Sequence, residues 1–369
     1  MTLGIVGGGQ LGRMMALAGY PLGLDFLFLD RSADSPAGQV APSLVGELND
    51  PALLRELAQR CQVLGFDWEN ISVPAVRAAT RGLRVRVAPP LRALATAQDR
   101  LSEKRCFERL RIPTTRHAPV SSRAALLRAL RDIGLPGVLK TRRMGYDGKG
   151  QVVIRTPADA DAAWQAMGDA PLLYEGFVPF DYEVSCIAVR GRDGEVVFYP
   201  LSRNVHRDGI LRVTLAPWRS ASLERAARRH LRALLQSLNY VGVLAVEFFV
   251  AGGRLIANEM APRVHNSGHW TIEGAVTSQF ENHVRALAGL PLGDTAPRGH
   301  AAMLNLIGAV PDMNRWLCLR DLHLHDYGKA ARAGRKVGHV TVLRAIRTHR
   351  DDAIRRLSRS LYPELGRII

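Results

Sequence analysis

The chain has 369 residues, of which 47% are hydrophobic, and a formal net charge of +16. This length suits two or three domains, and no run of eighteen apolar residues is present that would predict a membrane span. The basic residues are spread along the chain without interleaved aromatic residues, so we expect anionic small molecules rather than nucleic acid as partners.

The first part of the chain alternates between strands and helices. Apolar strands are expected at 3–7, 25–30 and 63–67, with helices at 11–19 and 52–60. Such alternation predicts a doubly wound parallel sheet with helices on both faces. The Pro89-Pro90 pair indicates a boundary, and the first α/β domain is placed at 1–94.

The rest of the chain divides into a small lid and a larger strand-rich domain. One long helix is expected over 91–110, and the lid, placed at 95–174, contains a glycine-rich loop. The third domain, 175–369, is expected to be a C-terminal mixed-sheet domain with an α+β tail. Its predicted strands are 183–190, 195–199, 241–250 and 254–259, and its predicted helices are 223–238 and 277–287.

Two features of the sequence bear on the compartment of the protein: its cysteines and its first residues. The cysteines, Cys61, Cys106, Cys186 and Cys318, show no metal-like spacing and fit reduced thiols. The opening M-T-L-G-I-V-G predicts a strand rather than a secretion signal. We therefore expect a cytoplasmic protein.

Lysine is rare in this chain. Of its 50 basic residues, the lysines are only Lys104, Lys140, Lys149, Lys329 and Lys336. A bias this strong indicates that the remaining lysines occupy positions where arginine cannot replace a compact ammonium group, although coincidence is the alternative. Four of them lie in two glycine-containing loops, 140–151 and 327–339, which together predict two phosphate sites.

A glycine turn follows the first predicted strand. Residues Gly7–Gly12 fit G-x-G-x-x-G before a helix, and Asp30 ends the next strand. Backbone N–H groups at such a helix start bind anions. The same pattern leaves open a dinucleotide site and an NAD(P)-dependent oxidoreductase.

The loop after Lys140 has the composition of a mobile phosphate-binding element. Gly145, Gly148 and Gly150 let the backbone fold over a ligand, and Lys149 can reach phosphate oxygens. No Walker A sequence is present. A glycine-rich hairpin with solvated charges is the alternative.

Two glutamates are expected to face each other across a hairpin. With Ala251-Gly252-Gly253 as the turn and a three-residue loop at 252–254, Glu247 and Glu259 lie directly opposite on one face. Like charges in this position are destabilising unless a cation bridges them, and Mg²⁺ prefers carboxylates and phosphates. Asn258 adds a neutral oxygen beside this site. Two solvent-facing glutamates are the alternative.

A polar segment follows the second glutamate strand. Arg263, in A-P-R-V-H-N-S-G-H-W (261–270), is placed to stabilise a transferring phosphoryl group or an acyl phosphate. Its histidines lack a third ligand at zinc-like spacing. Residues 175–178 and Glu183 are weaker candidates for contacts with adenine and ribose, because an ordinary strand and bend explains them equally well.

Together these residues resemble the ATP-grasp superfamily, and within it the 5-(carboxyamino)imidazole ribonucleotide synthases. The resemblance covers nearly the whole chain. It rests on G-G-G-Q-L-G-R-M (7–14), F-D-W-E-N (66–70), G-Y-D-G-K-G-Q (145–151), N-E-M-A-P-R-V-H-N-S-G-H-W-T (258–271), S-Q-F-E-N-H (278–283) and Y-G-K…G-R-K-V-G-H (327–339). Gly8 departs from the family, which often has asparagine there.

The resemblance implies an ATP-grasp fold and a reaction in which ATP and bicarbonate carboxylate the exocyclic amine of aminoimidazole ribonucleotide through carboxyphosphate, in purine biosynthesis. ATP, Mg²⁺ and a homodimer are also implied. The ATP site is expected to contain Arg100, Lys140, Gly145, Tyr146, Asp147, Gly148, Lys149, Gly150, Gln151, Glu175, Gly176, Phe177, Val178, Glu183, His206, Asn258 and Glu259.

The resemblance also implies a metal site, a set of catalytic residues and a ribonucleotide site. Glu247 and Glu259 are expected to bind Mg²⁺, and the catalytic residues are expected to be Arg263, Lys149 and Asn266. The ribonucleotide site is expected to contain Gln10, Leu11, Glu69, Asn70, Tyr146, Asp147, Lys329 and Arg335. A formate-using glycinamide ribonucleotide transformylase and a biotin carboxylase are the rivals, and the 327–339 motif favours the imidazole substrate.

Overall fold

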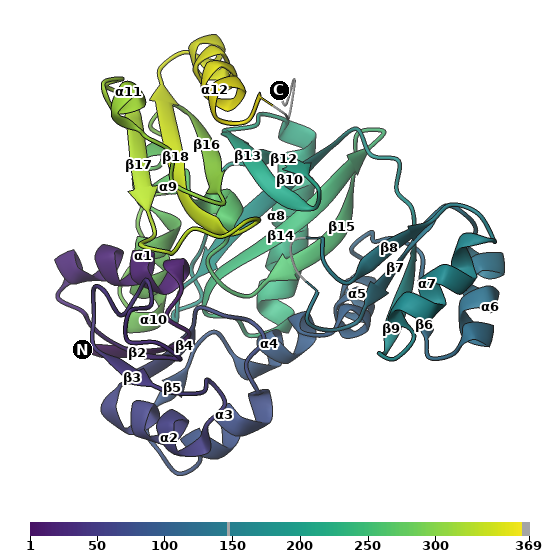
Figure 1. Cartoon of the computed structure of the whole chain (residues 1–369). Coiled ribbons are helices and arrows are strands. Elements are labelled where there is room, and N and C mark those ends of the chain that lie inside the picture. Colours follow the sequence, from purple (N-terminus) through teal and green to yellow (C-terminus); the bar gives the residue numbers. More distant parts are fainter. Residues whose placement is uncertain (146–147, 364–369) are drawn as a thin grey trace.

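The computed structural model describes residues 1–145 and 148–363, which form three sheets (Figure 1). Tyr146 and Asp147, both expected to contact ligands, lie outside the described residues. Among the described helices, none is long and apolar enough to cross a membrane. The four cysteines are all free, as expected for reduced thiols.

The N-terminal sheet is parallel, as predicted, and has the order β3-β2-β1-β4-β5. Its strands are β1 (Thr2–Val6), β2 (Asp25–Asp30), β3 (Ser43–Val45), β4 (Val63–Phe66) and β5 (Arg86–Val87). Helix α1 (Gln10–Gly19) packs on one face, and α2 (Pro51–Arg60) and α3 (Val73–Thr80) pack on the other (Figure 1). Both faces are therefore covered, which explains why these strands are apolar throughout.

The expected helix over 91–110 is two helices, α4 (Leu91–Ala97) and α5 (Arg100–Arg109). Asp99 separates them because its carboxylate accepts hydrogen bonds from the N–H groups of Leu101 and Ser102, which caps the start of α5. The cap places Arg100 in the first turn of α5, facing the large sheet through its ion pair with Glu259.

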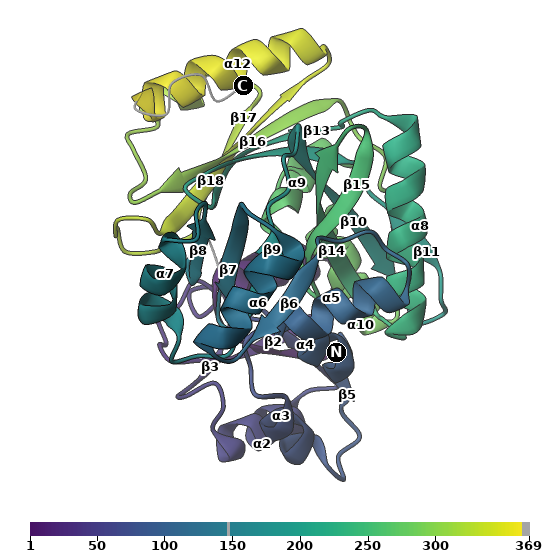
Figure 2. The same ribbon diagram turned by 90° about the vertical axis from the view of Figure 1, so that its right-hand side faces the viewer.

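The lid is a four-stranded antiparallel sheet of order β6-β9-β7-β8. Its strands are β6 (His117–Val120), β7 (Gly137–Thr141), β8 (Gln151–Ile154) and β9 (Leu172–Gly176). Helices α6 (Arg123–Ile133) and α7 (Asp159–Met167) pack together on one face (Figures 1 and 2). The lid sheet extends to Gly176, so the boundary expected after residue 174 falls inside β9.

The C-terminal sheet has nine strands in the order β15-β14-β10-β12-β13-β16-β18-β17, with β11 paired to β10. Its pairings are antiparallel rather than mixed as expected. The strands are β10 (Tyr182–Arg190), β11 (Val196–Phe198), β12 (Ser202–Arg207), β13 (Ile210–Ala216), β14 (Gly242–Ala251), β15 (Arg254–Ala261), β16 (His300–Ile307), β17 (Leu322–Asp326) and β18 (Lys336–Arg344).

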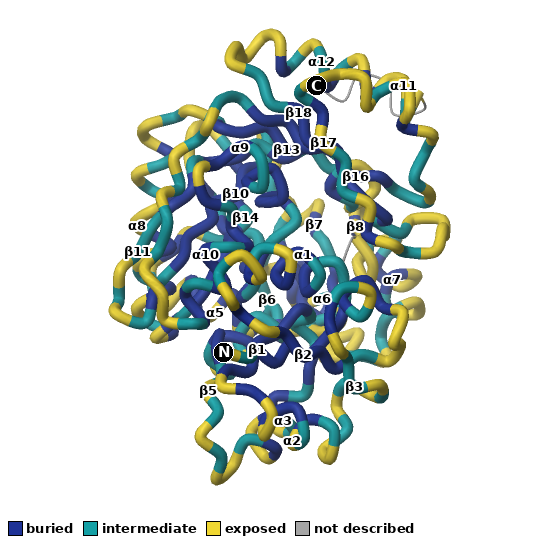
Figure 3. Tube along the Cα trace, turned by 90° about the vertical axis from the view of Figure 1, so that its left-hand side faces the viewer, coloured by how far each residue is buried: buried dark blue, intermediate teal, exposed yellow. Residues whose placement is uncertain are grey.

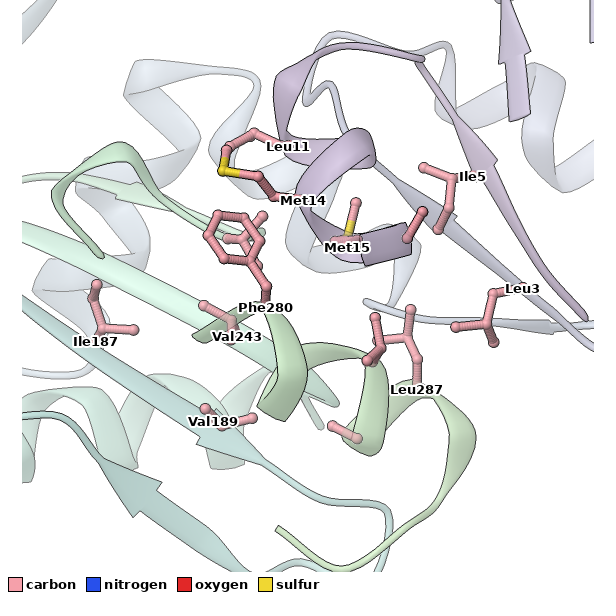
Figure 4. Packing of buried hydrophobic residues seen from close by; sticks show 14 of the residues in the cluster. Leu3, Ile5, Leu11, Met14, Met15, Ile187, Val189, Val243, Phe280 and Leu287 are labelled. Carbon is pink, nitrogen blue, oxygen red and sulfur yellow. The ribbon is translucent and has the colours of Figure 1, made fainter. Parts of the chain in front are cut away.

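The helices around this sheet bury both of its faces. They are α8 (Ala221–Ser237), α9 (Thr271–Gly274), α10 (Gln279–Ala288), α11 (Asn314–Leu317) and α12 (Arg347–Leu361), with a short 3₁₀ turn at Asn266–Gly268. A second 3₁₀ turn, Tyr20–Leu22, follows α1 in the N-terminal domain. On β14, Leu244 and Val246 pack with α8, whereas Val243 and Ala245 pack with α10 and α1; Figure 4 shows Val243 beside Phe280 of α10. The trace in Figure 3 shows much of this sheet as buried. Because side chains alternate along a strand, Glu247 belongs to the second series, on the face that carries the N-terminal domain.

Helix α1 joins the N-terminal domain to α10 through a shared core, in which Met15 is fully buried (Figure 4). We expect Met15→Ala to lower the free energy of unfolding by about 2–5 kcal/mol, because it removes apolar surface and leaves a cavity. Leu17→Ala on the exposed face of the same helix is the control, with an effect within about 0.5 kcal/mol. Urea unfolding measures both, and equal effects would contradict this account of the interface.

Candidate active site

Glu247 on β14 lies directly opposite Glu259 on β15, as predicted. The turn that leads to this pairing is not the three-residue loop that was expected. The turn has only Gly252 and Gly253, because Ala251 pairs with Arg254. A bulge between Glu247 and Phe248 then leaves Asn258 as an extra residue, and this shift restores the Glu247–Glu259 pair.

Lys104 of α5 holds this bulge. Its ammonium is fully buried and donates to the carbonyl oxygens of Asn258 at 2.7 Å and Ala257 at 3.4 Å. A bulge leaves its extra residue unpaired in the ladder, and here one small cation bonds two successive carbonyls at the bulge. Lys104 was not among the predicted site residues, although its place among the five lysines was the available signal.

Cations from two elements gather beside Glu259. Arg100 Nη1 lies 3.1 Å from Glu259 Oε2, and Lys140 Nζ lies 2.8 Å from Glu175 Oε2. Burial alone would raise the pKa of Glu175, but Lys104 and Lys140 outweigh it and lower this pKa to about 2. The predicted ATP-site residues Arg100, Lys140, Glu175 and Glu259 are thus brought together.

A second cluster surrounds Glu247. Burial raises the pKa of Glu247 to about 7, His206 opposes this rise, and the carboxylates of Glu259 and Glu183 add to it. His206 Nδ1 lies 2.7 Å from Glu183 Oε2, and although burial opposes it, this contact raises the pKa of His206 to about 9. Two facing carboxylates beside Asn258 Oδ1, which is buried without a hydrogen-bond partner among the described residues, form a donor set that fits Mg²⁺.

The glycine-rich loop joins β7 to β8 and reaches the turn between β12 and β13. A Cβ at Gly148 would lie 3.0 Å from Gly209 Cα, and its φ of +74° also favours glycine. Gly150 accepts a hydrogen bond from the N–H of Thr141, which closes the hairpin before Gln151. Lys149 and Gly148 are exposed, and Gly145 lies beside Arg100. Gly148, in the described part of the predicted phosphate loop, therefore lies against the large sheet.

Residues expected to contact adenine lie at the end of β9. The Phe177 ring is exposed, and the Phe177 N–H donates to the carbonyl of Pro136. Gly176 and Val178 flank it on the chain. Their contact with adenine stays a prediction.

Arg263 is fixed by Glu69. Both Nε and Nη2 of the guanidinium bond the carboxylate, the latter at 3.0 Å, so a residue of the C-terminal domain pairs with one of the N-terminal domain. The next segment contains Asn266, whose amide nitrogen and oxygen are both buried without a hydrogen-bond partner among the described residues. His265 Nε2 lies 3.7 Å from Glu247 Oε1. The predicted catalytic segment thus adjoins the predicted metal carboxylates and contains a buried amide without a hydrogen-bond partner among the described residues.

The two predicted substrate loops meet at Gln10 and Lys329. The Lys329 ammonium donates to Gln10 Oε1, and burial lowers the pKa of Lys329 to about 8. Leu11 packs in the core, so it offers a ligand only its main chain. Arg335 donates to the carbonyl of Ala330 within the same basic loop, and Asn70 lies next to Glu69.

The first glycine turn differs from a dinucleotide site. The N–H of Gly8 donates to Asp30 Oδ2 at 2.7 Å, and the N–H of Gly12 donates to Asp67 Oδ2 at 2.9 Å. Protein carboxylates therefore occupy the groups that a pyrophosphate would need, which argues against the NAD(P) alternative. A Cβ at Gly8 would lie 2.6 Å from Ser35 Oγ, so this turn requires glycine where the family often has asparagine.

Family models match three parts of the chain. Residues 1–98 match the ribonucleotide synthetase preATP-grasp domain, 105–280 the ATP-grasp domain, and 301–352 the phosphoribosylaminoimidazole carboxylase C-terminal domain. The N5-carboxyaminoimidazole ribonucleotide synthase of Pseudomonas aeruginosa is 52% identical over 93% of this chain and 94% of its own length. The chain belongs to the N5-carboxyaminoimidazole ribonucleotide synthase family.

Solved structures of this synthase family agree. The synthetase from Thermus thermophilus is 52% identical, with a TM-score of 0.93 over 98% of both chains. The Aspergillus clavatus synthase in complex with ADP and 5-aminoimidazole ribonucleotide is 30% identical, with a TM-score of 0.89 over 96% of this chain and 97% of that one. The ATP-grasp fold expected from the sequence is confirmed.

Lys104 provides a test of how the bulge shapes the site. We expect Lys104→Met to raise the KM for MgATP about tenfold or more, because unsatisfied carbonyls relax the bulge and move Glu259. Arg105→Met, at an exposed position of the same helix, is the control. Steady-state kinetics would contradict the idea if both variants kept the wild-type KM.

Glu175 provides a test of the buried charge cluster. Since its pKa is lower when folded, its stabilising contribution is complete above its ordinary pKa and is lost as the pH falls toward about 2. Glu175→Gln should cost about 3 kcal/mol of unfolding free energy at neutral pH, because Lys104 and Lys140 lose their counter-charge. The difference from wild type should shrink as the pH is lowered.

Urea unfolding at several pH values measures this difference. Glu56→Gln, which breaks an exposed pair with Arg60, is the control and should cost less than about 1 kcal/mol. A difference between Glu175→Gln and wild type that is independent of pH would show that the carboxylate does not act through its charge.

Proposed function

We propose that this chain uses ATP and bicarbonate to carboxylate the exocyclic amine of 5-aminoimidazole ribonucleotide, in purine biosynthesis. One observation carries the proposal: three polar contacts lie between the ATP-type cluster and the predicted substrate loops, and they involve residues of both the N-terminal and the C-terminal domains. Glu247 adjoins His265, Arg263 bonds Glu69, and Lys329 bonds Gln10. Burial raises the pKa of Asp67, and the N–H of Gly12 and the charges of Arg263 and Lys329 oppose this rise, so both cations lie near one carboxylate.

ATP is held by residues of the lid and the large sheet in this proposal. Arg100, Lys140 and Lys149 neutralise phosphate oxygens, while residues 175–178, Glu183 and His206 bind the nucleoside. Glu247, Glu259 and Asn258 would hold Mg²⁺, which when bound stabilises the charge on the transferring phosphoryl group. The orphaned oxygen of Asn258 and the facing carboxylates support this assignment.

Arg263 and Asn266 serve the bicarbonate. A bicarbonate oxygen attacks the γ-phosphorus, the bond to the β-phosphate oxygen breaks, and carboxyphosphate and ADP result. The amine then takes the carboxyl carbon, directly or as released CO₂, and phosphate leaves. Glu69 bonds Nε and Nη2 of Arg263, and the carbonyl of Val264 accepts from Nη1, so the guanidinium is oriented before the reaction. The Asn266 amide, which has no hydrogen-bond partner among the described residues, is available to the bicarbonate in this proposal. Closure of the lid keeps water from the labile intermediate.

The ribonucleotide is placed between the N-terminal domain and the basic loop. Lys329 and Arg335 bind its phosphate, and Gln10, Leu11, Glu69 and Asn70, with Tyr146 and Asp147, surround the ring and ribose. The lowered pKa of Lys329 suits this role, because a phosphate dianion close by favours the charged form of its ammonium group. We also propose that the protein acts in the cytoplasm as a homodimer, as the family resemblance implies.

Phosphate release from MgATP, with bicarbonate and with or without aminoimidazole ribonucleotide, tests the proposal. We expect strong stimulation by the nucleotide, and a loss of about 100-fold or more in Glu259→Gln, because a carboxylate of the metal site is neutralised. Glu195→Gln, in an exposed turn, is the control and should match wild type. ATP turnover that ignores this nucleotide but responds to another amine would discard the substrate and keep the ATP-grasp chemistry.

A further inference from the structure

A buried phenol connects the two predicted substrate segments. Tyr327 begins the basic loop 327–339 and is 1% exposed. Its hydroxyl lies 2.8 Å from His339 Nδ1 and 3.2 Å from His269 Nδ1. His269 ends the 3₁₀ turn that carries Asn266, so one hydroxyl bridges the ribonucleotide loop and the bicarbonate segment.

The single hydrogen of the Tyr327 hydroxyl determines which groups donate and which accept in this bridge. A hydroxyl has one hydrogen, so Tyr327 donates to one imidazole and accepts from the other. Burial holds the pKa of both His269 and His339 well below the ordinary range, so both rings are neutral. The two rings must then adopt opposite tautomers: one carries its hydrogen on Nδ1 and the other on Nε2. The hydroxyl therefore fixes the tautomer as well as the orientation of each ring.

Each end of the bridge is tied to predicted ligand-binding groups. The Lys329 ammonium lies 5.8 Å from the centre of the Tyr327 ring and reaches Gln10. On the other side, Gln279 holds the start of the 265–269 segment: its Oε1 accepts from the N–H of His265 at 3.0 Å, and its Nε2 donates to the carbonyl of His265 at 2.6 Å. A displacement of the Tyr327 ring would thus shift Lys329 and the segment of Asn266 together.

The far side of the network is braced. His325 stacks on His339 with ring centres 4.4 Å apart, and its Nε2 lies 2.6 Å from Glu273 Oε1. Glu273 belongs to α9, which directly follows the 265–269 segment. His325 therefore connects His339 on β18 to Glu273 on α9. The Tyr327 hydroxyl is the group that contacts both His269 and His339.

We propose that Tyr327 is a positioning residue that couples ribonucleotide binding at the basic loop to the geometry of the bicarbonate segment. The inference rests on the proposed function and adds to it a residue that touches neither substrate. Its hydroxyl sets the position of Lys329 relative to Asn266. The amine must meet the carboxyl donor between these two residues.

Tyr327→Phe tests the proposal, since it keeps the ring and removes only the hydroxyl. We expect the Kd of aminoimidazole ribonucleotide, measured by calorimetry, and its KM to rise about tenfold, the ratio for a loss near 1.4 kcal/mol. The KM for MgATP should stay unchanged, because the ATP-site contacts do not involve this bridge.

Tyr199→Phe is the matched control. Tyr199 is also 1% exposed, and its hydroxyl also makes two hydrogen bonds, to the carbonyl of Thr277 and from Asn282 Nδ2, each at 2.9 Å. Both variants should lose similar thermal stability, and only Tyr327→Phe should lose ribonucleotide affinity.

The results of these measurements distinguish the role of Tyr327 from the proposed function of the protein. Wild-type affinity for the ribonucleotide in Tyr327→Phe, or equal losses in both variants, would overturn the coupling role and leave the proposed function standing. Failure of the wild-type protein to bind the ribonucleotide would overturn both.

Discussion

The repulsion between Glu247 and Glu259 is the constraint around which this region is built. Two carboxylates cannot face each other on a largely buried sheet without cations nearby. Arg100 pairs with one, His206 lies near the other, and Lys104 fixes the bulge that brings them into register. The hairpin, α5 and β12 are therefore tied together by electrostatics as much as by packing.

This constraint explains why the domains converge at the same place. The capping of α5 by Asp99 directs Arg100 toward β15, and the lid sheet supplies Lys140 from β7. The N-terminal domain contributes Glu69, which orients Arg263 immediately after β15. Each domain thus adds a charge that would be poorly compensated without the others, which favours a single arrangement of the three units.

The rarity of lysine gains a physical explanation from these contacts. Lys104 bonds two carbonyls of a bulge in a fully enclosed space, where the planar guanidinium of arginine would not fit without displacing its neighbours. Lys140 pairs with buried Glu175, and Lys329 is partly buried against Gln10 and Tyr327. At each of these three positions a compact ammonium bonds a nearby oxygen; burial alone does not select lysine, because Arg350 is also fully buried.

The sequence by itself determined the parallel N-terminal sheet, the lid with its glycine-rich loop, and the facing glutamates, because alternation, glycines and turn residues are local signals. It also determined the family, through motifs spread along the chain. Only the tertiary structure decided the bulge at Asn258, the split at Asp99, the antiparallel direction of the large sheet, and the buried contacts of Lys104 and Tyr327. The contacts of Lys104 with Asn258 and of Tyr327 with His269 join residues more than fifty positions apart, and the split at Asp99 depends on a capping choice between two helices. Such compensation of buried polar groups leaves no periodic signal in the sequence.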